Sequence, residues 1–415
     1  MFAAHVSTSL GAELSPTRAM RSPRWSRAAA LALVAVFVAS CGGGVDSGGT
    51  GAPAVAFASG PITGFGSVIV NGVHFDDRTA AVNDADGNPR TRDDLRLGMT
   101  TDVRGLAIGA DSDGNSASVA TSIVFGSELL GPVAASNLVA RTLVVLGQTV
   151  DIATTTVFDT SLVGGQAALA IGDVVEVYAQ LDAANGHYAA TRVERKSGVT
   201  AFVLRGIVAG LDTAARTFSI GTTRISYAGI AAGSVPATLG NGRFVRAFVN
   251  VAPGAGGVWT AFRLSDGAPS IDDRSEVKVK GLVSAFTSNT AFSVNGTIVD
   301  ARSASFPAGT AGLGLGTRVE VEGSTVAGVL VARSVTIVTD NEESGRDFDV
   351  RGAIASIDTT AKLFVVRDVT VSYAGSVDFR DGTAADLATG KQVEARGKLS
   401  ADGTKLIATR IDFRH

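Results

Sequence analysis

Residues 315–323, LGTRVEVEG, contain a pattern that this chain of 415 residues repeats five times. In each copy a glycine is followed, after two residues, by a triplet that usually places a charged residue between two apolar ones. The glycines are 74, 70, 74 and 74 residues apart, at Gly98, Gly172, Gly242, Gly316 and Gly390. Self-similarity at a regular spacing is typical of chains built from tandem structural units. The sequence therefore predicts five copies of one small module.

The alternation within the repeat predicts a half-buried β-strand. Side chains of a strand point alternately to its two faces, so Val319 and Val321 share one face and Glu320 and Glu322 share the other. We expect the valines to fill a core and the glutamates to meet water. Gly316 is expected to free the backbone at the point where the preceding linker turns into the strand.

The rest of each module also indicates β-structure. Asn71-Gly72 and Asn295-Gly296 stand between short apolar runs, and Asn-Gly is a strong hairpin signal. About five short strands per module, with turn signals between them, favour a sandwich or barrel over a βαβ unit. We predict an all-β chain of five tandem, five-stranded OB-like barrels.

Module boundaries follow from the spacing of these signals. Linkers as short as Ser197-Gly198 leave little room for free tumbling, and a module of this size is marginally stable alone, so neighbours are expected to stack. We place the modules at residues 59–128, 129–197, 198–271, 272–343 and 344–415.

The N-terminal segment has the order of a secretory signal. Arginines at 18–27 precede an apolar run at 28–39, which is shorter than the roughly 20 residues needed to span a bilayer. The following V-A-S-C, ending in the single cysteine Cys41, resembles the lipobox of bacterial lipoproteins. The resemblance implies a signal peptide at residues 1–40, a lipidated Cys41, and, with Gly42 next, sorting to the outer membrane. We predict that translation starts at Met20 and that residues 41–58 form a flexible linker.

The modules themselves resemble a family of bacterial secreted and lipid-anchored proteins built from tandem copies of an uncharacterised β-barrel domain. The shared pattern is G-x-[VI], a V-N-G hairpin, G-x-x-V-E-V, and D-G-x-x-x-A-x-x-I, and it covers residues 59–415. The third copy departs most, with Arg246 where glutamate is usual. This resemblance implies architecture and location but no established activity.

Composition narrows the classes of partner. The net charge is −3, and without residues 1–40 the chain has 32 basic and 38 acidic residues, or −6. A mildly acidic chain does not have the electrostatic footprint of a nucleic-acid-binding protein. An OB face for single strands would also present aromatic platforms, whereas the phenylalanines here lie mostly in apolar runs.

Two acidic stretches resemble the beginnings of calcium loops. An EF-type loop needs glycine at its sixth position and a bidentate glutamate at its twelfth, and neither stretch has them. Turn formation at Asp-Gly is the favoured reading. The candidate ligands are Asp84, Asp86, Asp111 and Asp113.

Other motifs favour structural roles. The glycines of residues 312–316 precede a strand, whereas a dinucleotide site needs a helix there. Glu320 and Glu322 could suggest glycoside hydrolysis, but both are expected on a solvated face. The four histidines are far apart, and no Ser-His-acid set is evident. We therefore expect no enzyme, metal or cofactor.

One series of arginines recurs on the closing strand of successive modules. Cross-strand pairing with the glutamate series is the favoured reading, and a stripe that binds an acidic ligand is the alternative. The four residues are Arg192, Arg263, Arg333 and Arg410.

These observations favour a non-enzymatic, lipid-anchored cell-envelope protein that serves as a repeat scaffold or interaction surface. The alternative is an OB-type binding protein for an oligosaccharide or envelope polymer. The expected partners are the membrane, through the lipid, and an envelope polysaccharide or protein, but not nucleic acid. Local function is expected where the copies differ, in the loops at 84–94, 229–241 and 253–257.

Overall fold

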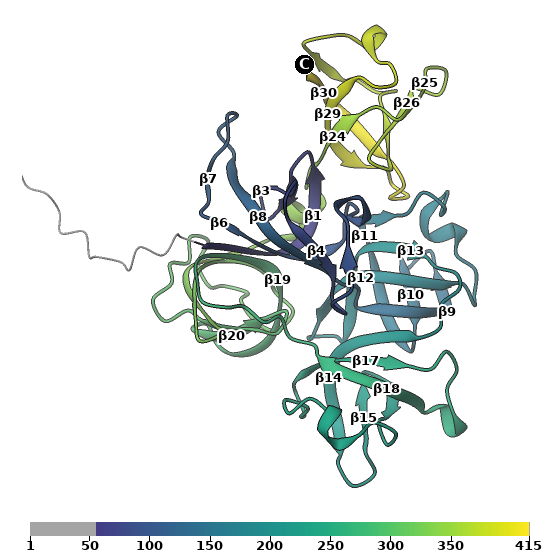
Figure 1. The fold of residues 1–415 in the computed structure, drawn as a ribbon, viewed down its shortest axis with the longest axis vertical. Helices are drawn as coiled ribbons and strands as arrows, with labels where there is room; N and C mark the ends of the chain where they lie inside the picture. Colours follow the sequence, from purple (N-terminus) through teal and green to yellow (C-terminus); the bar gives the residue numbers. More distant parts are fainter. Residues whose placement is uncertain (1–54, 415) are drawn as a thin grey trace, which may run out of the picture. The chain divides into compact units, whose positions relative to one another are not determined.

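The computed structural model describes residues 55–414, in which strands dominate and five groups of strands each close into a barrel (Figure 1). Module 1 has β1 (Val55–Phe65), β2 (Val68–Val70), β3 (Val73–Asp76), β4 (Ala81–Asp84), β5 (Pro89–Arg90), β6 (Thr100–Leu106), β7 (Gly109–Ala110) and β8 (Ser116–Phe125). Module 2 has β9 (Leu129–Asn137), β10 (Thr142–Val145), β11 (Gln148–Phe158), β12 (Val174–Asp182) and β13 (His187–Arg195). Module 3 has β14 (Phe202–Asp212), β15 (Thr217–Ile220), β16 (Thr223–Ser226), β17 (Phe244–Val249) and β18 (Trp259–Asp266).

The last two modules follow the same plan. Module 4 has β19 (Arg274–Ser288), β20 (Ala291–Val294), β21 (Thr297–Asp300), β22 (Arg318–Val326) and β23 (Val329–Ile337). Module 5 has β24 (Phe348–Ala353), β25 (Ser356–Asp358), β26 (Leu363–Val366), β27 (Val369–Ser372), β28 (Asp378–Arg380), β29 (Gln392–Leu399) and β30 (Leu406–Arg414). The helical pieces are η1 (Arg92–Asp94), η2 (Gly165–Ala168), η3 (Ala232–Ser234), η4 (Ala255–Gly257), α1 (Asp340–Ser344) and η5 (Ala384–Asp386).

Every barrel has the same strand order. In module 2, for example, β9 pairs with β10, β10 with β11, β11 with β13 in parallel, β13 with β12, and β12 with β9. The order first–second–third–fifth–fourth–first, with one parallel pair, is that of an OB barrel. The predicted fold class, five tandem OB-like barrels, is therefore confirmed.

The repeated glycine explains how each barrel closes. All five glycines have φ between 78° and 92°, a left-handed conformation that other residues adopt only with strain. The N–H of Gly316 donates to the Val283 carbonyl at 2.9 Å, and the Val283 N–H donates to the Thr317 carbonyl at 2.9 Å. The other four copies make the same two hydrogen bonds between glycine and first strand. The glycine therefore fixes the start of the fourth strand against the first.

A β-bulge recurs at one position of every fifth strand. The register between the fourth and fifth strands shifts by one residue in all five modules, so one residue of the fifth strand has no partner opposite. Bulges bend the strand and re-aim side chains. The bulged residues are Thr121, Thr191, Phe262, Arg333 and Thr409.

The modules are joined through their first strands. β1 pairs in parallel with β19 over Ala56–Ser59 and with β24 over Gly64–Phe65, and β9 pairs with β14 through Leu129 and Leu130. The strand β1 begins at Val55, so residues 55–58, which we expected in the flexible linker 41–58, are strand instead. They are ordered because β19 and β6 both pair with them.

The hydrophobic cores extend across these joints. One buried cluster combines side chains of modules 1 and 5 and includes Val157 and Tyr178 of module 2. A second combines modules 2 and 3, and a third unites module 4 with Phe57 of module 1. Burial of apolar surface between modules offsets the small core available to each one alone. Residues 55–414 contain no helix that is long and apolar enough to cross a membrane.

Candidate functional site

The outward face of the fourth strand carries different residues in different copies. The inward positions of β22 are the buried valines Val319 and Val321, as predicted. At the outward position that Glu322 occupies in module 4, the other modules carry Arg104, Tyr178, Phe248 and Arg396. Modules 2 and 3 thus carry aromatic residues where the others carry charged ones.

These two aromatic residues line a groove formed by modules 1, 2 and 3. Its volume is about 770 Å³, within the range of small-molecule sites. Module 1 contributes its 84–99 segment, module 2 the outward face of β12 and the end of β13, and module 3 the outward face of β17 and β18. The 84–94 loop, predicted as a place of local function, therefore reaches the groove.

Most charged side chains of the groove are paired with one another. Five acidic and five basic residues line it, so their formal charges cancel. Lys196 contacts Glu176 at 2.8 Å and Glu194 at 2.7 Å. Arg246 contacts Asp86 at 3.0 Å. The groove is therefore strongly polar without being strongly acidic or basic.

An aromatic pair forms one wall of the groove. The Phe248 and Phe262 rings lie 6.5 Å apart at 52°, and the guanidinium of Arg263 stands 3.5 Å from the Phe248 ring centroid. Phe248 is buried, whereas Phe262, the bulged residue of β18, is 52% exposed. The bulge thus turns an aromatic ring outward at the edge of a charged groove.

Tyr178 presents a polar atom from a buried ring. The residue is 2% exposed and packs in the core cluster of module 1. The residue lines the groove together with Glu176, Glu194 and Arg246. Burial, followed by the Glu176 and Glu194 carboxylates, raises the Tyr178 pKa well above its usual value. The hydroxyl therefore keeps its proton and can donate into the groove.

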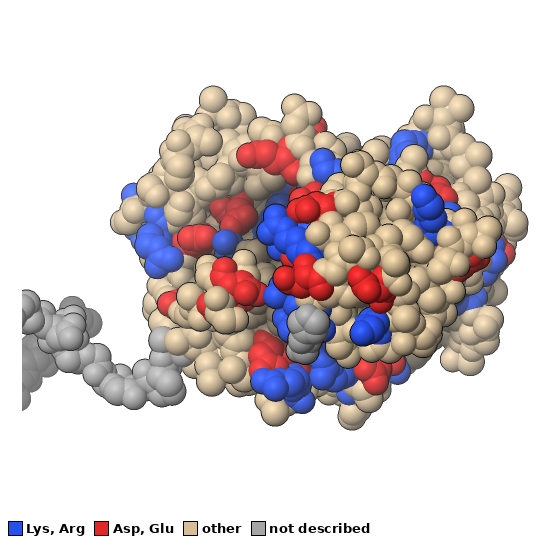
Figure 2. Space-filling model, turned by 90° about the horizontal axis from the view of Figure 1, so that it is seen from above, with Lys and Arg blue, Asp and Glu red and all other residues tan. Residues whose placement is uncertain are grey.

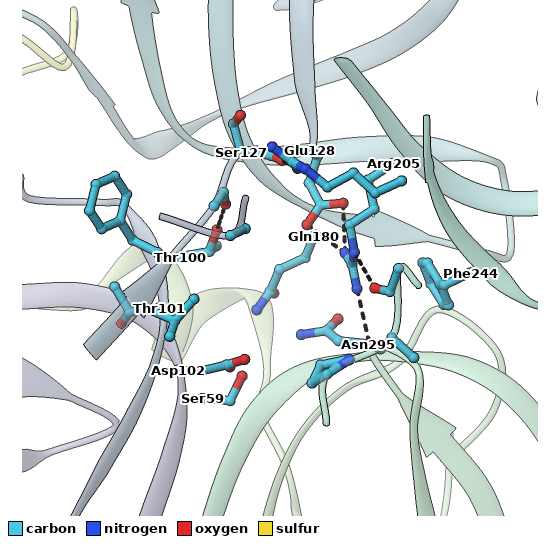
Figure 3. Close-up of a pocket in the computed structure, with 18 of the residues that line it drawn as sticks. Ser59, Thr100, Thr101, Asp102, Ser127, Glu128, Gln180, Arg205, Phe244 and Asn295 are labelled. Carbon is cyan, nitrogen blue, oxygen red and sulfur yellow. Dashed lines mark hydrogen bonds and ion pairs between the residues drawn. The ribbon is translucent and has the colours of Figure 1, made fainter. Parts of the chain in front are cut away.

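A smaller cavity of about 280 Å³ adjoins the groove and shares Ser127 and Arg246 with it. Modules 1 to 4 all contribute to its wall. In Figure 3, Asp102 and Ser59 lie together on one side, and Glu128, Arg205 and Asn295 lie on another.

Arg205 links three of the modules around this cavity. Its guanidinium donates to both Glu128 carboxylate oxygens at 2.6 and 2.7 Å, to the Gly267 carbonyl at 2.5 Å and to the Asn295 carbonyl at 3.4 Å (Figure 3). Glu128 is 8% exposed and Arg205 stacks 4.7 Å from the Phe244 ring centroid. A buried, bidentate pair of this kind is geometrically specific and fixes how its modules meet.

Asp102 is the acidic residue of the cavity with the most altered titration. Burial raises its pKa, and the Ser59 hydroxyl and the Arg104 guanidinium partly counteract this effect. The carboxyl therefore retains its proton more readily than an exposed aspartate does. Together with the amide of Asn295, it offers hydrogen-bonding groups to the cavity.

The surface charge is mixed. Figure 2 shows acidic and basic side chains interspersed over the face it displays, without a continuous patch of one sign. Such a face offers no strong attraction to a highly charged polymer.

The predicted calcium-loop aspartates act as turn residues. Asp84 accepts hydrogen bonds from the backbone N–H of Asp86 and Asn88 at 3.0 and 2.9 Å, and pairs with Arg90 at 2.7 Å. Asp111 likewise accepts from the backbone N–H of Asp113 and Asn115 at 2.9 and 2.8 Å. Asp86 pairs with Arg246, and Asp113 with Arg414 at 3.6 Å. Within residues 55–414 no group of three or more potential metal ligands converges.

Each arginine of the predicted series contacts a carboxylate, but in most cases it is not the cross-strand glutamate that we expected. Arg192 and Arg410 pair with Glu194 and Asp412, two residues further along the same strand, at 2.5 and 2.6 Å. Side chains two residues apart share a face, so this pairing competes with the expected cross-strand one. Arg263 contacts Asp86 at 3.4 Å. Arg333 occupies the bulge of β23 and is the one of the four that reaches its fourth-strand glutamate, Glu322, at 3.9 Å.

The remaining predicted positions are structural in this fold. Glu320 and Glu322 lie on the outward face of β22, and Lys278 of the first strand pairs with them at 2.8 and 3.1 Å. Gly316 begins the fourth strand as described above. Cys41, the signal peptide and Met20 lie outside the described residues.

Sequence reasoning missed the groove. The signal for it was present in Tyr178 and Phe248, two aromatic residues at outward positions of a strand whose other copies carry charge there. The predictions treated the outward face as solvated throughout.

Comparison with known families agrees with the repeat. The family described as "Domain of unknown function (DUF5666)" matches three segments of the chain, residues 131–194, 280–336 and 351–412. These lie within modules 2, 4 and 5. No curated protein matches the chain. The chain thus contains repeats of an uncharacterised β-barrel domain.

Proposed function

We propose that this protein is a non-enzymatic, lipid-anchored component of the cell envelope, and that its five barrels form a fixed scaffold for binding. The observation that carries the scaffold role is the joining of the modules. First strands of different modules pair with each other, and the buried Glu128–Arg205 pair extends to Gly267 and Asn295. Modules connected only by flexible linkers would not need such contacts.

Anchoring at the membrane is supported by the lipobox-like residues before Cys41. Gly42 after the cysteine favours the outer membrane. The test is metabolic labelling with a fatty acid in cells expressing the wild type or Cys41→Ala. We expect the label on the wild type only. Equal labelling of the two proteins would contradict lipidation at this residue.

The scaffold role has a separate test. Because Cys41 is the only cysteine, Cys41→Ala gives a cysteine-free chain in which pairs of spin labels can be placed at exposed positions such as Val139 and Val326. We expect a narrow distance distribution between labels in modules 2 and 4, comparable to that of a pair within one barrel. A broad distribution between modules, with a narrow one inside a barrel, would contradict a fixed scaffold.

The second candidate function is OB-type binding of an oligosaccharide or envelope polymer. The groove between modules 1, 2 and 3 favours it, because it combines a suitable volume with an exposed aromatic ring and many polar groups. In-envelope crosslinking followed by identification of bound protein and glycan distinguishes a binding scaffold from a passive spacer.

A further inference from the structure

We propose that the groove between modules 1, 2 and 3 binds an uncharged oligosaccharide, with Phe262 as the stacking platform and Tyr178 as a hydrogen-bond donor. The proposal rests on the proposed binding role and assigns it a place and a ligand chemistry.

The charge balance selects against strongly charged ligands. Five acidic and five basic residues line the groove, and most of them form ion pairs with one another. A polyanion would meet the carboxylates of Glu176 and Glu194, and a polycation would meet Arg246 and Arg263. A ligand without net charge avoids both repulsions.

The polar groups suit hydroxyl-rich ligands. Carboxylates accept and guanidinium groups donate several hydrogen bonds each, so an ion pair can still bind hydroxyl groups with its remaining sites. Arg263 remains 46% exposed at its side chain and Lys196 36%. Both therefore have donors that are free to meet a ligand.

Tyr178 adds a hydrogen-bonding group to the groove. Its ring is 2% exposed, and a phenolic hydroxyl can both donate and accept hydrogen bonds. The residue lines the groove together with Glu176, Glu194 and Arg246. A ligand hydroxyl at this point can pair with it.

Phe262 provides the apolar half of the recognition. Its ring is 52% exposed at the β18 bulge, while Arg263 already covers the neighbouring Phe248 ring. Ring faces carry partial negative charge and attract the polarised C–H groups on the apolar face of a sugar. An aromatic face beside dense hydrogen-bonding groups matches an oligosaccharide better than a purely polar or purely apolar ligand.

The test uses the full chain with a panel of defined probes. The neutral probes are chitotetraose, cellotetraose and maltotetraose, and the charged ones are tetragalacturonate and a tetra-arginine peptide. Binding is measured by saturation-transfer NMR and titration calorimetry at millimolar probe concentration. We expect at least one neutral tetrasaccharide to bind and both charged probes to bind more weakly.

Three variants locate the site. Phe262→Ala is expected to weaken binding about tenfold or more. Tyr178→Phe keeps the buried ring and is expected to weaken it about threefold to tenfold. Phe286→Ala, at an exposed phenylalanine of β19 outside the groove, is the matched control and should bind as the wild type does. Unchanged thermal unfolding of each variant shows that the fold is intact.

The binding measurements can overturn the proposed ligand without affecting the proposed scaffold. The proposal is overturned if no neutral tetrasaccharide binds, if a charged probe binds best, or if Phe262→Ala and Tyr178→Phe bind as tightly as the wild type. The spin-label distances and fatty-acid labelling report on the scaffold and the anchor independently. A failed glycan test with a narrow distance distribution would therefore refute the ligand and leave the scaffold standing.

Discussion

Replacing Gly316 by alanine tests both the closure of a barrel and its contact with a neighbour. Gly316 has φ 78° and joins the fourth strand to Val283 of the first. A Cβ at this position would also meet the side chain of Asp182, at the end of β12 in module 2, and, at 2.8 Å, the Cβ of Ala184 in the turn that follows. The equivalent Gly390 of module 5 has φ 86° and open space around it.

The two alanine variants should differ by the cost of this contact. An alanine in the left-handed region costs about 1–2 kcal/mol, and this is the whole effect expected for Gly390→Ala. Gly316→Ala bears the same backbone cost plus about 1–3 kcal/mol for overpacking against module 2. The Asp182 carboxylate cannot simply swing aside, because it accepts the Ala184 N–H at 2.9 Å.

Hydrogen exchange measured by mass spectrometry resolves the modules, which a global unfolding curve of a repeat protein does not. For Gly390→Ala we expect exchange to quicken about 5- to 30-fold in module 5 alone. For Gly316→Ala we expect a larger increase in module 4, together with faster exchange in the 182–187 turn of module 2. Gly314→Ala is the control, because no left-handed conformation or close neighbour restricts that glycine.

The outcome that would refute the reasoning is equally specific. If Gly316→Ala affected module 4 no more than Gly390→Ala affects module 5, and if the 182–187 turn stayed protected, modules 2 and 4 would not be in contact there. If Gly390→Ala had no effect, the left-handed glycine would not govern closure.

Two further predictions concern buried charges. Glu128→Met or Arg205→Met alone leaves a buried charge unpaired and should lower the unfolding free energy by about 3–5 kcal/mol. The double variant should lose clearly less than the sum of the two single losses. Additive losses in denaturant unfolding would show that the two side chains do not stabilise each other. Burial and the Glu394 carboxylate raise the Asp349 pKa from 3.8 to about 6. The folded state therefore binds this proton more tightly, so its contribution to stability, about 3 kcal/mol in full, grows as pH falls through about 6 and is lost as pH rises. Asp349→Asn should remove this component from the pH dependence of thermal unfolding. Asp378→Asn, at an exposed position, should not. Identical pH profiles for the wild type and Asp349→Asn would refute the contribution of Asp349.

The fold was predictable because the determining signals are local. A left-handed glycine before an alternating strand, and Asn-Gly between short strands, specify backbone conformation within a few residues. Asn71 and Gly72 have φ 51° and 73°, as a two-residue hairpin turn of this kind requires. The glycine and its strand recur in all five copies, and the Asn-Gly turn between the second and third strands recurs in two of them. The OB-like barrel was predicted from the number of short strands and from the turn signals between them.

The joints between modules were not predictable in the same way. The pairing of β9 with β14 involves only Leu129 and Leu130 on one side and Val203 and Leu204 on the other. Such apolar residues are equally expected inside a single barrel, so their pattern does not reveal a second partner. Residues 55–58 were expected in a linker for the same reason, since their order depends on β19, more than 200 residues away in the sequence.

The candidate site depends both on positions that repeat in every module and on positions that differ between modules. Inward positions of the fourth strand are similar in all copies because they fill equivalent cores, so repetition there reports on folding. Outward positions are free to differ, and they do so at Tyr178, Phe248 and Arg246, all of which line one groove. Burial where the modules meet accounts for these three, since Tyr178, Phe248 and Arg246 are 2%, 5% and 6% exposed. It does not account for Phe262, whose ring is 52% exposed at the same groove. A bound ligand would account for that ring, and this is why the loss of binding in Phe262→Ala, rather than loss of stability, is the decisive measurement.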